Sequence, residues 1–434
     1  MKYLKTIWFL ALITSFFGPT LAIPGYESIF AYRILLVVHV IGFLGYCLWK
    51  RKEMQFHIEV KEYIWFYFFW FGWAVVSLIW ADSKGDALRH IWFMFSGISL
   101  IGFSIFHIKE EKDFRHLYQI FIAVLLMFLG VSLWEHVFRY NVGVGGSAVF
   151  FERGIPNGFL HNPNDLATFL TLYIPFFICP LFSVHKNRYR WMGIVGIPLA
   201  LHVILLTRSR ANILAVVIII IGAIILMKPW KVLKKAGVWG AVIGAGIIVL
   251  LICLYNFNQD FWNFIEKEKQ MILTQIFSLE GGSSVDIRVI LLQLGYGLLR
   301  GHFFLGVGAG NVEYHLIPYR EMTQGIVNMH NWWGEIFVNY GIIIGFMYLF
   351  FFAKMWWELF KIYKSSAEGF LKVIVQSLLV SFCGFAVAVT SSSTMAASRY
   401  MWVLFGFALC VINYYRRMAL KEVTSPEKNS IRLK

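Results

Sequence analysis

Residues 211–227 read ANILAVVIIIIGAIILM, an apolar run without one charged side chain. About 20 apolar residues in an α-helix cross the hydrocarbon core of a bilayer, which is about 30 Å thick. Similar runs recur along the whole chain, in which 59% of the residues are apolar and only 15% are charged. In soluble domains roughly half of the residues are apolar and roughly a quarter are charged. The sequence therefore predicts an all-α polytopic integral membrane protein.

Outward from this run, the sequence predicts one membrane domain over residues 1–415 and a cytoplasmic basic tail over 416–434. Its twelve expected spans lie at about 6–23, 30–48, 63–81, 90–107, 117–134, 166–183, 191–207, 211–227, 236–255, 334–353, 373–390 and 398–414. The first could be mistaken for a signal peptide, because Lys2 and Lys5 precede its apolar stretch. That stretch is long for a signal peptide, so we expect an uncleaved first span.

The basic residues are distributed unevenly over the two sides of this arrangement. If both termini are cytoplasmic, the inner segments hold 26 of the 39 lysines and arginines, and the outer segments hold 13. Cytoplasmic loops carry such an excess, so the long polar insertion at about 256–331, between spans nine and ten, is expected outside. The net charge of +15 then reflects topology and anionic inner-leaflet lipid, not nucleic-acid binding. We expect a multi-pass protein of the cytoplasmic membrane.

Five cysteines, at 47, 179, 253, 383 and 410, lie inside or at the ends of apolar runs. None forms a C-x-x-C pair or neighbours a histidine cluster, so they indicate packing residues rather than a metal site or a disulfide framework. In the insertion, Asp286 and Glu313 are too scattered to suggest a cation cage. We therefore expect neither a metal nor another cofactor.

The turn before residues 211–227 carries the first candidate site. It reads Leu206-Thr207-Arg208-Ser209-Arg210-Ala211-Asn212 and leaves almost no loop between two spans. Snorkelling to the interface would explain one arginine near the bilayer. Two arginines on the outer side, where the excess of basic residues in cytoplasmic loops makes them unexpected, favour an anion-binding site. Because the planar guanidinium donates two hydrogen bonds at once to phosphate, Arg208 and Arg210 are candidate phosphate ligands.

The long insertion supplies further cations. Arg288 and Arg300 bracket an apolar stretch at 289–299, which is too short to span and predicts an interfacial helix. Extending it into a thirteenth span would bury Arg300 and reverse the orientation of everything downstream, against the basic inner loops. The glycine turn at 306–311 lacks the spacing and the βαβ context of a nucleotide-binding loop. It predicts a tight turn back to the membrane, and it could let backbone approach a ligand.

His330 and Asn331 lie immediately before the tenth span. A histidine at a helix start is often only a polar cap or an interface residue. His330 would, however, share one outer surface with three arginines. Its neutral imidazole can accept a proton from an attacking hydroxyl near neutral pH, so His330 is the candidate base.

A second outer loop, at about 135–165, adds weaker candidates. His161 and Asn164 face the same side as the insertion, and we include them as secondary site residues together with Asn331 and Arg300. Asn164 or Asp165 is expected to cap the following helix, which would explain Asp165 without a functional role.

Together these pieces resemble the O-antigen ligase and polysaccharide polymerase family of multi-span membrane proteins. The matching segments are Thr207 to Ala211, then Arg288 about eighteen residues before the turn at 305–311, and finally His330-Asn331 followed by Gly341 and Gly345. The number of spans and the large outer loop in the C-terminal half also match. The chain departs from the family pattern at Gly334, Asn339, Leu291 and Leu292.

The resemblance implies a GT-C-like fold and an inverting, metal-independent glycosyltransferase. The donor would be a glycan linked to undecaprenyl diphosphate, and the acceptor a hydroxyl at the outer face of the membrane. Arg210, Arg208 and Arg288 would bind the diphosphate and stabilise it as it leaves, and His330 would be the base. Implied partners are the lipid-linked donor, a glycan or lipid-glycan acceptor, membrane lipid and other polysaccharide-assembly proteins.

Two alternatives stay open within the resemblance, and two outside it. The Lys-, Ile- and Phe-rich composition indicates a low-GC organism without lipopolysaccharide, which slightly favours a polymerase, for example of an exopolysaccharide or a teichuronic acid-like polymer, over a ligase. A lipid-glycan flippase or transporter should carry charged or broken-helix features near the bilayer midplane, whereas these spans are mostly clean. A non-catalytic assembly partner would explain the topology but not the convergence of three arginines and a histidine.

Overall fold

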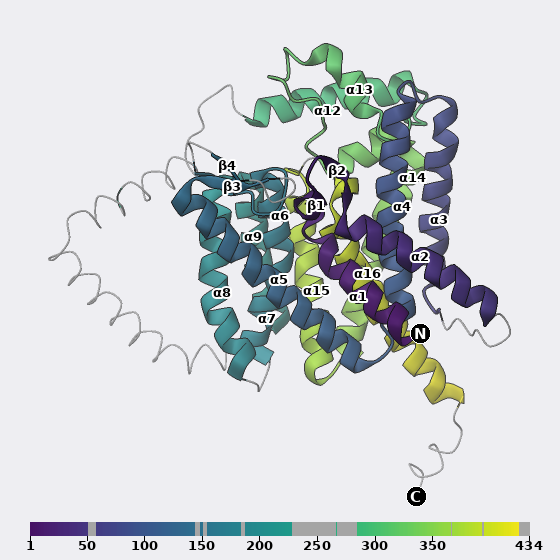
Figure 1. Cartoon of the computed structure of the whole chain (residues 1–434), viewed down its shortest axis with the longest axis vertical. Helices are drawn as coiled ribbons and strands as arrows, with labels where there is room; N and C mark the ends of the chain where they lie inside the picture. Colours follow the sequence, from purple (N-terminus) through teal and green to yellow (C-terminus); the bar gives the residue numbers. More distant parts are fainter. Residues whose placement is uncertain are drawn as a thin grey trace, which may run out of the picture.

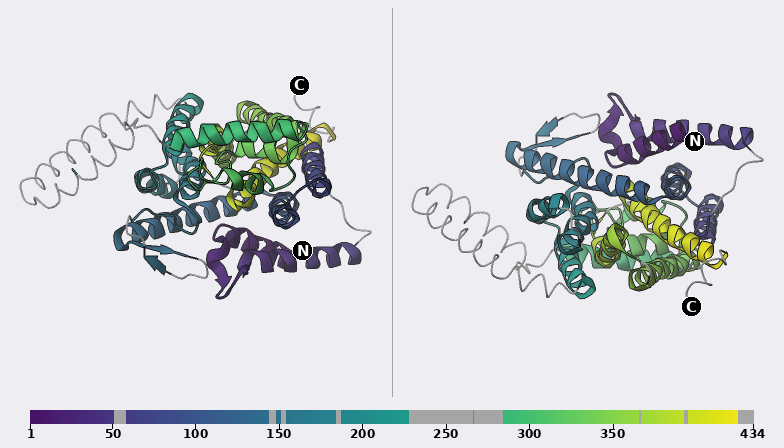
Figure 2. Two further views of the ribbon diagram at one scale, coloured as in Figure 1. Left: turned by 90° about the horizontal axis from the view of Figure 1, so that it is seen from above. Right: turned by 90° about the horizontal axis from the view of Figure 1, so that it is seen from below.

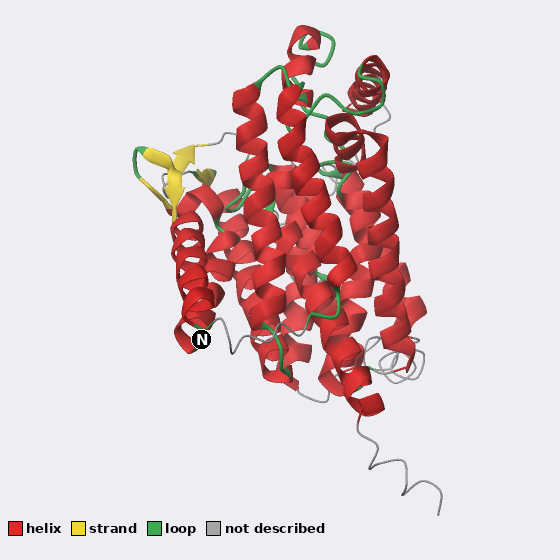
Figure 3. Ribbon diagram, turned by 90° about the vertical axis from the view of Figure 1, so that its right-hand side faces the viewer, coloured by secondary structure: helices red, strands yellow, loops and turns green. Residues whose placement is uncertain are grey.

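The computed structural model describes residues 1–50, 58–143, 148–150, 154–183, 187–227, 266, 284–365, 367–392 and 395–424. Over these ranges the chain is a bundle of long helices (Figure 1). Beside them, strands β1 (Ala22–Ile23) and β2 (Tyr26–Phe30) form one antiparallel pair, and β3 (Tyr140–Val142) and β4 (Ala148–Phe150) form another (Figure 3). The prediction of an all-α polytopic membrane protein is confirmed.

Ten helical segments of the described chain are long and apolar enough to cross a membrane. They are α2 (Ala31–Trp49), α3 (Lys61–Val76) with the 3-10 turn η2 (Ser77–Ile79), α4 (Lys84–His107), α5 (Glu111–Phe138), α6 (Pro163–Tyr173) with α7 (Pro175–Ser183), α8 (Asn187–Leu206), α9 (Arg210–Met227), α14 (Trp332–Ser365), α15 (Gly369–Ala388) and α16 (Arg399–Thr424). Each coincides with a span predicted from its apolar run. The ninth predicted span, at 236–255, lies outside the described residues, so the total of twelve stays a prediction.

The first predicted span, at about 6–23, is wrong at its C-terminal end. Helix α1 covers only Lys2–Ser15, and the 3-10 turn η1 (Gly18–Leu21) and β1 follow it. The helix stops because Gly18 has a φ of +51° and Pro19 has no N–H to donate. Helix α1 packs along α2, where the ring centroids of Trp8 and His39 lie 5.1 Å apart.

An aromatic core fixes the start of α14 within the bundle. Trp70 of α3 is buried, and its ring lies 6.2 Å from that of Trp332 and 5.9 Å from that of Trp402 in α16. The indole N–H of Trp332 donates to the hydroxyl of Tyr348 at 2.9 Å. The first turn of α14, two residues after His330, is therefore held by packing and by hydrogen bonds.

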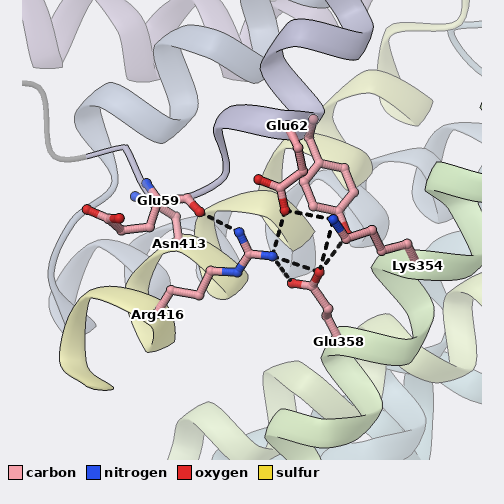
Figure 4. Close-up of polar contacts among 7 residues, drawn as sticks. Glu59, Glu62, Lys354, Glu358, Asn413 and Arg416 are labelled. Carbon is pink, nitrogen blue, oxygen red and sulfur yellow. Dashed lines mark hydrogen bonds and ion pairs between the residues drawn. The ribbon is translucent and has the colours of Figure 1, made fainter. Parts of the chain in front are cut away.

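An ionic network ties three helices together at the end of the bundle where α1 begins and α16 ends (Figures 1 and 4). Arg416 of α16 lies 2.7 Å from carboxylate oxygens of both Glu62 in α3 and Glu358 in α14. Lys354 of α14 lies 2.9 Å from the same Glu62 oxygen. Two cations thus face two carboxylates. We call this group of four residues the paired network.

Three short elements lie across the opposite end of the bundle, namely α12 (Ser284–Gly301), α13 (Val312–Leu316) and the 3-10 turn η4 (Ile317–Tyr319) (Figure 2). Helix α12 contains the interfacial helix predicted at 289–299, and it is not among the candidate spans. The thirteenth-span alternative therefore receives no support. The part of the insertion before Ser284 lies outside the described residues, Glu266 excepted.

The glycine turn at 306–311 packs against a break in α14. Gly341 there has a φ of +83° and a ψ of 177°, so α14 consists of two helices joined across a kink. Two N–H groups of the turn donate to the carbonyls of Val338 and Asn339 at 2.8 and 3.0 Å, which satisfies carbonyls that the kink would expose. A Cβ on Gly306 would lie 2.6 Å from the Asn339 oxygen. The predicted tight turn is confirmed, and its backbone approaches α14.

The same turn also docks on the segment between α3 and α4. Asn311 is fully buried, and its side-chain oxygen accepts from the N–H of Ser83 at 2.7 Å. The amide nitrogen of Asn311 donates back to the Ser83 carbonyl at 3.2 Å, and the N–H of Ala309 donates to the Ser77 hydroxyl at 3.0 Å. The turn therefore holds the end of α3, the start of α4 and the first part of α14 together.

Candidate active site

His330 is held from both sides by its neighbours in the chain. Met329 is buried, and a Cβ added to Gly295 of α12 or Gly334 of α14 would lie 2.7 or 3.0 Å from its terminal methyl carbon. Asn331 caps α14, because its side-chain oxygen accepts from the N–H of Gly334 at 3.2 Å. The candidate base therefore sits where α12 crosses the start of α14. The cap explains Asn331 without a role in chemistry.

Within the described residues, one imidazole nitrogen of His330 contacts the protein and the other has no hydrogen-bond partner. Nδ1 lies 3.3 Å from the carbonyl oxygen of Ser391. A carbonyl only accepts hydrogen bonds, so Nδ1 carries the proton and Nε2 is the basic nitrogen. Burial lowers the pKa of His330 below its ordinary 6.5; the Ser391 carbonyl raises it, Arg288 lowers it and Asp165 raises it. The lowered pKa keeps the imidazole neutral, and able to accept a proton, at neutral pH.

Arg288 brings α12 into the same site. Burial lowers the pKa of its guanidinium, and the nearby charge of Arg210 lowers it further. Arg288 thus lies within electrostatic range of both Arg210 and His330. Among the residues that the structure describes, no ion pair involves Arg288. These influences link α9, α12 and the segment just before α14, which carry three of the sequence-predicted residues.

Two of the candidate residues have backbone in the left-handed region. The φ of Arg208 is +59° and that of His330 is +42°. A residue with a Cβ pays about 1–2 kcal/mol for this conformation, and such positions cluster at functional sites. The side chains of Arg208 and Arg210 are exposed at the short turn between α8 and α9, where a ligand can reach them.

The other secondary candidates lie elsewhere. Arg300 is exposed at the far end of α12, and the helical rise of 1.5 Å per residue puts it about 18 Å along the axis from Arg288. It therefore stays outside the cluster around His330. Asn164 is half-buried in the first turn of α6, and the exposed His161 precedes that helix. The cap of α6 is Asn162, not Asn164 or Asp165, because Asn162 accepts from the N–H of Asp165 at 2.9 Å.

Sequence reasoning missed Asp165 as part of the site. Its carboxylate is buried, accepts from the side-chain amide of Asn162 at 2.7 Å and from the hydroxyl of Ser392, and lies close enough to His330 to raise its pKa. Ser392 follows Ser391, whose carbonyl contacts the imidazole. The signal in the sequence was the run of hydroxyl residues at 391–394 between two apolar spans.

A buried polar cluster joins this region to the arginine turn. The side-chain amide nitrogen of Asn212, which carries two hydrogens, lies 2.9 Å from the hydroxyl oxygens of both Ser209 and Ser391 and 3.2 Å from that of Thr168. Asn212 is fully buried. Because unpaired polar groups are costly in such a place, these bonds fix the turn that carries Arg208 and Arg210 relative to Ser391.

A polar cavity of about 470 Å³ opens beside the same site. Asp165 lines it, and so does Asn328, two residues before His330. Other charged or titratable lining residues are Glu27, Arg33, Asp86, Arg89, His90, His161, Glu313 and Arg399. Within the described part of the chain, no group of three or more His, Cys, Asp or Glu residues could hold a metal ion. The arrangement offers a base, a set of cations and a space for a polar substrate.

Two comparisons with known proteins bear on this geometry. A family model described as O-Antigen ligase matches residues 195–350, a range that contains Arg208, Arg210, Arg288 and His330. Over 402 residues the chain is 27% identical to the teichuronic acid biosynthesis protein TuaE of Bacillus subtilis (strain 168). The aligned region covers 91% of this chain and 80% of that relative. Both agree with the family suggested by the arginine, glycine and histidine motifs. Residues 195–350 thus resemble the O-Antigen ligase family, and the chain over most of its length resembles TuaE; the two similarities together support a membrane protein of the O-antigen ligase/polymerase type.

Proposed function

We propose that the protein transfers a glycan from a lipid-diphosphate donor to an acceptor hydroxyl at the outer face of the cytoplasmic membrane. One observation carries this proposal: His330, whose pKa is lowered, feels the charges of both Arg288 and Asp165; Arg288 in turn feels the charge of Arg210, and Asp165 lines a polar cavity. The donor's lipid is undecaprenyl diphosphate, both termini are cytoplasmic, and the site faces outward.

The arginines bind the diphosphate of the donor. Arg288 and Arg210 repel each other without a ligand, and a diphosphate between them turns this repulsion into attraction. Guanidinium groups donate paired hydrogen bonds to phosphate oxygens, and Arg208 adds a third cation at the turn. These contacts strengthen as negative charge develops on the leaving diphosphate, which is the condition for catalysis.

His330 activates the acceptor. Its Nε2 takes the proton of the acceptor hydroxyl while the hydroxyl oxygen bonds to the anomeric carbon of the donor sugar. The bond from that carbon to the diphosphate oxygen breaks, and the lipid diphosphate leaves with the bonding electron pair. Because it leaves from the face opposite to the attacking hydroxyl, the anomeric configuration is inverted. Asp165 stabilises the imidazolium that forms. Because arginines neutralise the leaving group, the reaction needs no metal.

The similarity to a teichuronic acid biosynthesis protein favours a polymerase over a ligase. In a polymerase the acceptor is itself a glycan repeat unit. Such an acceptor needs a polar space beside the base, and the cavity lined by Asp165 and Asn328 supplies one.

The test is transfer by the purified protein in detergent with the lipid-linked donor, with and without EDTA. His330→Gln should lose about 10²- to 10⁴-fold in rate, the usual contribution of a general base, while donor binding survives. An amide keeps hydrogen bonding but cannot accept the proton. Normal turnover by this variant, or loss of wild-type activity on chelation, would contradict the mechanism.

A further inference from the structure

Two arginines from distant parts of the sequence share one phenylalanine ring on the wall of the polar cavity. The guanidinium carbons of Arg33, in the first turn of α2, and Arg399, the first residue of α16, each lie 4.8 Å from the ring centroid of Phe30. Arg399 also lies 5.7 Å from the ring of Tyr32. Aromatic faces attract cations, but they do not neutralise them.

No carboxylate in the described part of the chain balances these two cations. The Nε atoms of Arg33 and Arg399 are both buried without a hydrogen-bond partner, and no ion pair among the described residues involves either side chain. The hydrogen bond of Arg33 goes to the neutral carbonyl of Ser28 at 2.8 Å. By contrast, Arg89 on the same cavity wall lies 3.2 Å from Asp86. Two like charges with partly buried donors indicate a site for an anion.

The cavity connects this pair with the reaction centre. Arg33, Arg399, Asp165 and Asn328 all line it, and Asp165 acts on His330. The N-terminus of α16 also faces the cavity, since Ser398, Arg399 and Tyr400 line it. Free N–H groups at a helix start favour an anion.

The remaining walls suit a carbohydrate. Phe16, Phe93 and Phe159 contribute aromatic surface, and Ser28 and Ser398 contribute polar groups. A sugar ring has apolar C–H faces that pack on aromatic rings and hydroxyls that bond to polar side chains. A cavity of about 470 Å³ is within the usual range for small-molecule sites.

We propose that this cavity is the acceptor subsite and that Arg33 and Arg399 bind the carboxylate of an acidic sugar in the acceptor glycan. The proposal rests on the transfer function above and specifies its substrate. The donor arginines, Arg210 and Arg288, are absent from the cavity lining, whereas Asp165 belongs to it and influences His330. The base therefore stands between a donor side and an acceptor side.

Binding of a matched pair of oligosaccharides to the full-length protein in detergent tests the subsite. The probes are a tetrasaccharide of uronic acid residues and the same tetrasaccharide with its carboxyl groups reduced to alcohols, measured by calorimetry. The acidic probe should bind about ten- to hundredfold more tightly. Arg33→Gln and Arg399→Gln should each reduce that preference while leaving the affinity for the reduced probe unchanged. Equal binding of both probes to the wild type would overturn the proposal.

Three further variants serve as controls for this proposal. Arg320→Gln removes an exposed outer arginine that does not line the cavity, and it should keep the full preference. His330→Gln should also keep it, so a failure of the proposed chemistry is distinguishable from a failure of the subsite. Arg33→Lys keeps the positive charge, and a thermal melt checks that the variants are folded. A folded variant that loses affinity for both probes would contradict the assignment.

Phosphate shares the relevant chemistry with carboxylate, and two competition arms distinguish the sources. A tetrasaccharide of neutral sugars bearing one phosphate ester should compete more weakly than the uronic acid probe, and stronger competition would overturn the carboxylate assignment. Vesicles of phosphatidylglycerol should not displace the acidic probe. Displacement would assign the pair to a lipid headgroup instead.

Discussion

The two ends of the helix bundle treat cations in opposite ways. In the paired network, Arg416 and Lys354 face Glu62 and Glu358 at 2.7 to 2.9 Å (Figure 4). At the other end, Arg288 lies in the field of Arg210, and Arg399 in that of Arg33. Neither Arg288 nor Arg399 takes part in an ion pair among the described residues. We propose that the difference reflects function: a balanced cation joins helices, whereas a cation beside another cation prepares a place for an anion.

The two ends of the bundle are expected to lie on opposite sides of the membrane, and labelling of introduced cysteines tests this orientation with an all-or-none result. Cysteine introduced at Glu321, which is exposed near η4, should react with an impermeant thiol reagent in intact cells whose outer surface is accessible. Cysteine at Ser365, which is exposed at the last turn of α14, should react only after lysis. The parent chain supplies the background. The reverse pattern would place His330 in the cytoplasm and exclude the proposed donor.

Activity should separate the two classes of arginine. Arg288→Lys and Arg210→Lys keep the charge but lose the planar fork, so transfer should fall about ten- to hundredfold, because a bidentate charge-assisted contact is worth about 1.5–3 kcal/mol. Arg416→Lys is the matched control, and its rate per folded molecule should equal that of the wild type. If all three variants lose the same activity, the arginines near His330 have no special role.

Thermal stability should depend on Arg416 of the paired network and not on Arg399, the reverse of what is expected for function. Arg416→Gln removes hydrogen bonds to Glu62 and Glu358, and hydrogen bonds to charged groups contribute about 1.5–3 kcal/mol. Thermal unfolding in detergent should show a lower midpoint. Arg399→Gln removes a cation without a carboxylate partner, so its midpoint should change little or rise. A comparable drop in both variants would mean that Arg399 is balanced in the folded protein.

The smallest expected effects are opposite shifts in the pH dependence of transfer. His330 acts as a base only when neutral, so kcat/KM should fall as the pH drops through its pKa, which lies below 6.5. Arg288 lowers this pKa, so Arg288→Gln should move the acidic limb to higher pH. Asp165 raises it, so Asp165→Asn should move the limb to lower pH. Profiles at constant ionic strength measure both, and shifts in the same direction would disprove the proposed electrostatics.

The sequence predicted the helices well because apolar runs determine them directly. Ten predicted spans have counterparts, and the helix predicted between Arg288 and Arg300 is present within α12. The end of α1 was missed because the overall hydropathy of 6–23 concealed the local effect of Gly18 and Pro19. The break in α14 was missed for a similar reason: Gly341 lies inside a strongly apolar run.

The site was only half predictable, for a different reason. Arg210, Arg288 and His330 stood out because polar residues are scarce on an outer surface between apolar runs. Arg33 and Arg399 did not, because each is a single arginine at a helix start, where snorkelling is the ordinary explanation. Only the packing of α16 against the start of α2 puts both on Phe30. Asp165 was assigned to a helix cap, which Asn162 provides instead.

The docking of the glycine turn has a consequence for how such proteins can diverge. Asn311 is fastened to Ser83 at one end of the outer segment, and Met329 is wedged beside Gly295 at the other. The residues between them at 317–327 are largely exposed. Insertions or deletions there can therefore reshape the outer face without moving His330. Such changes would alter the exposed surface of the protein while the position of His330 is preserved.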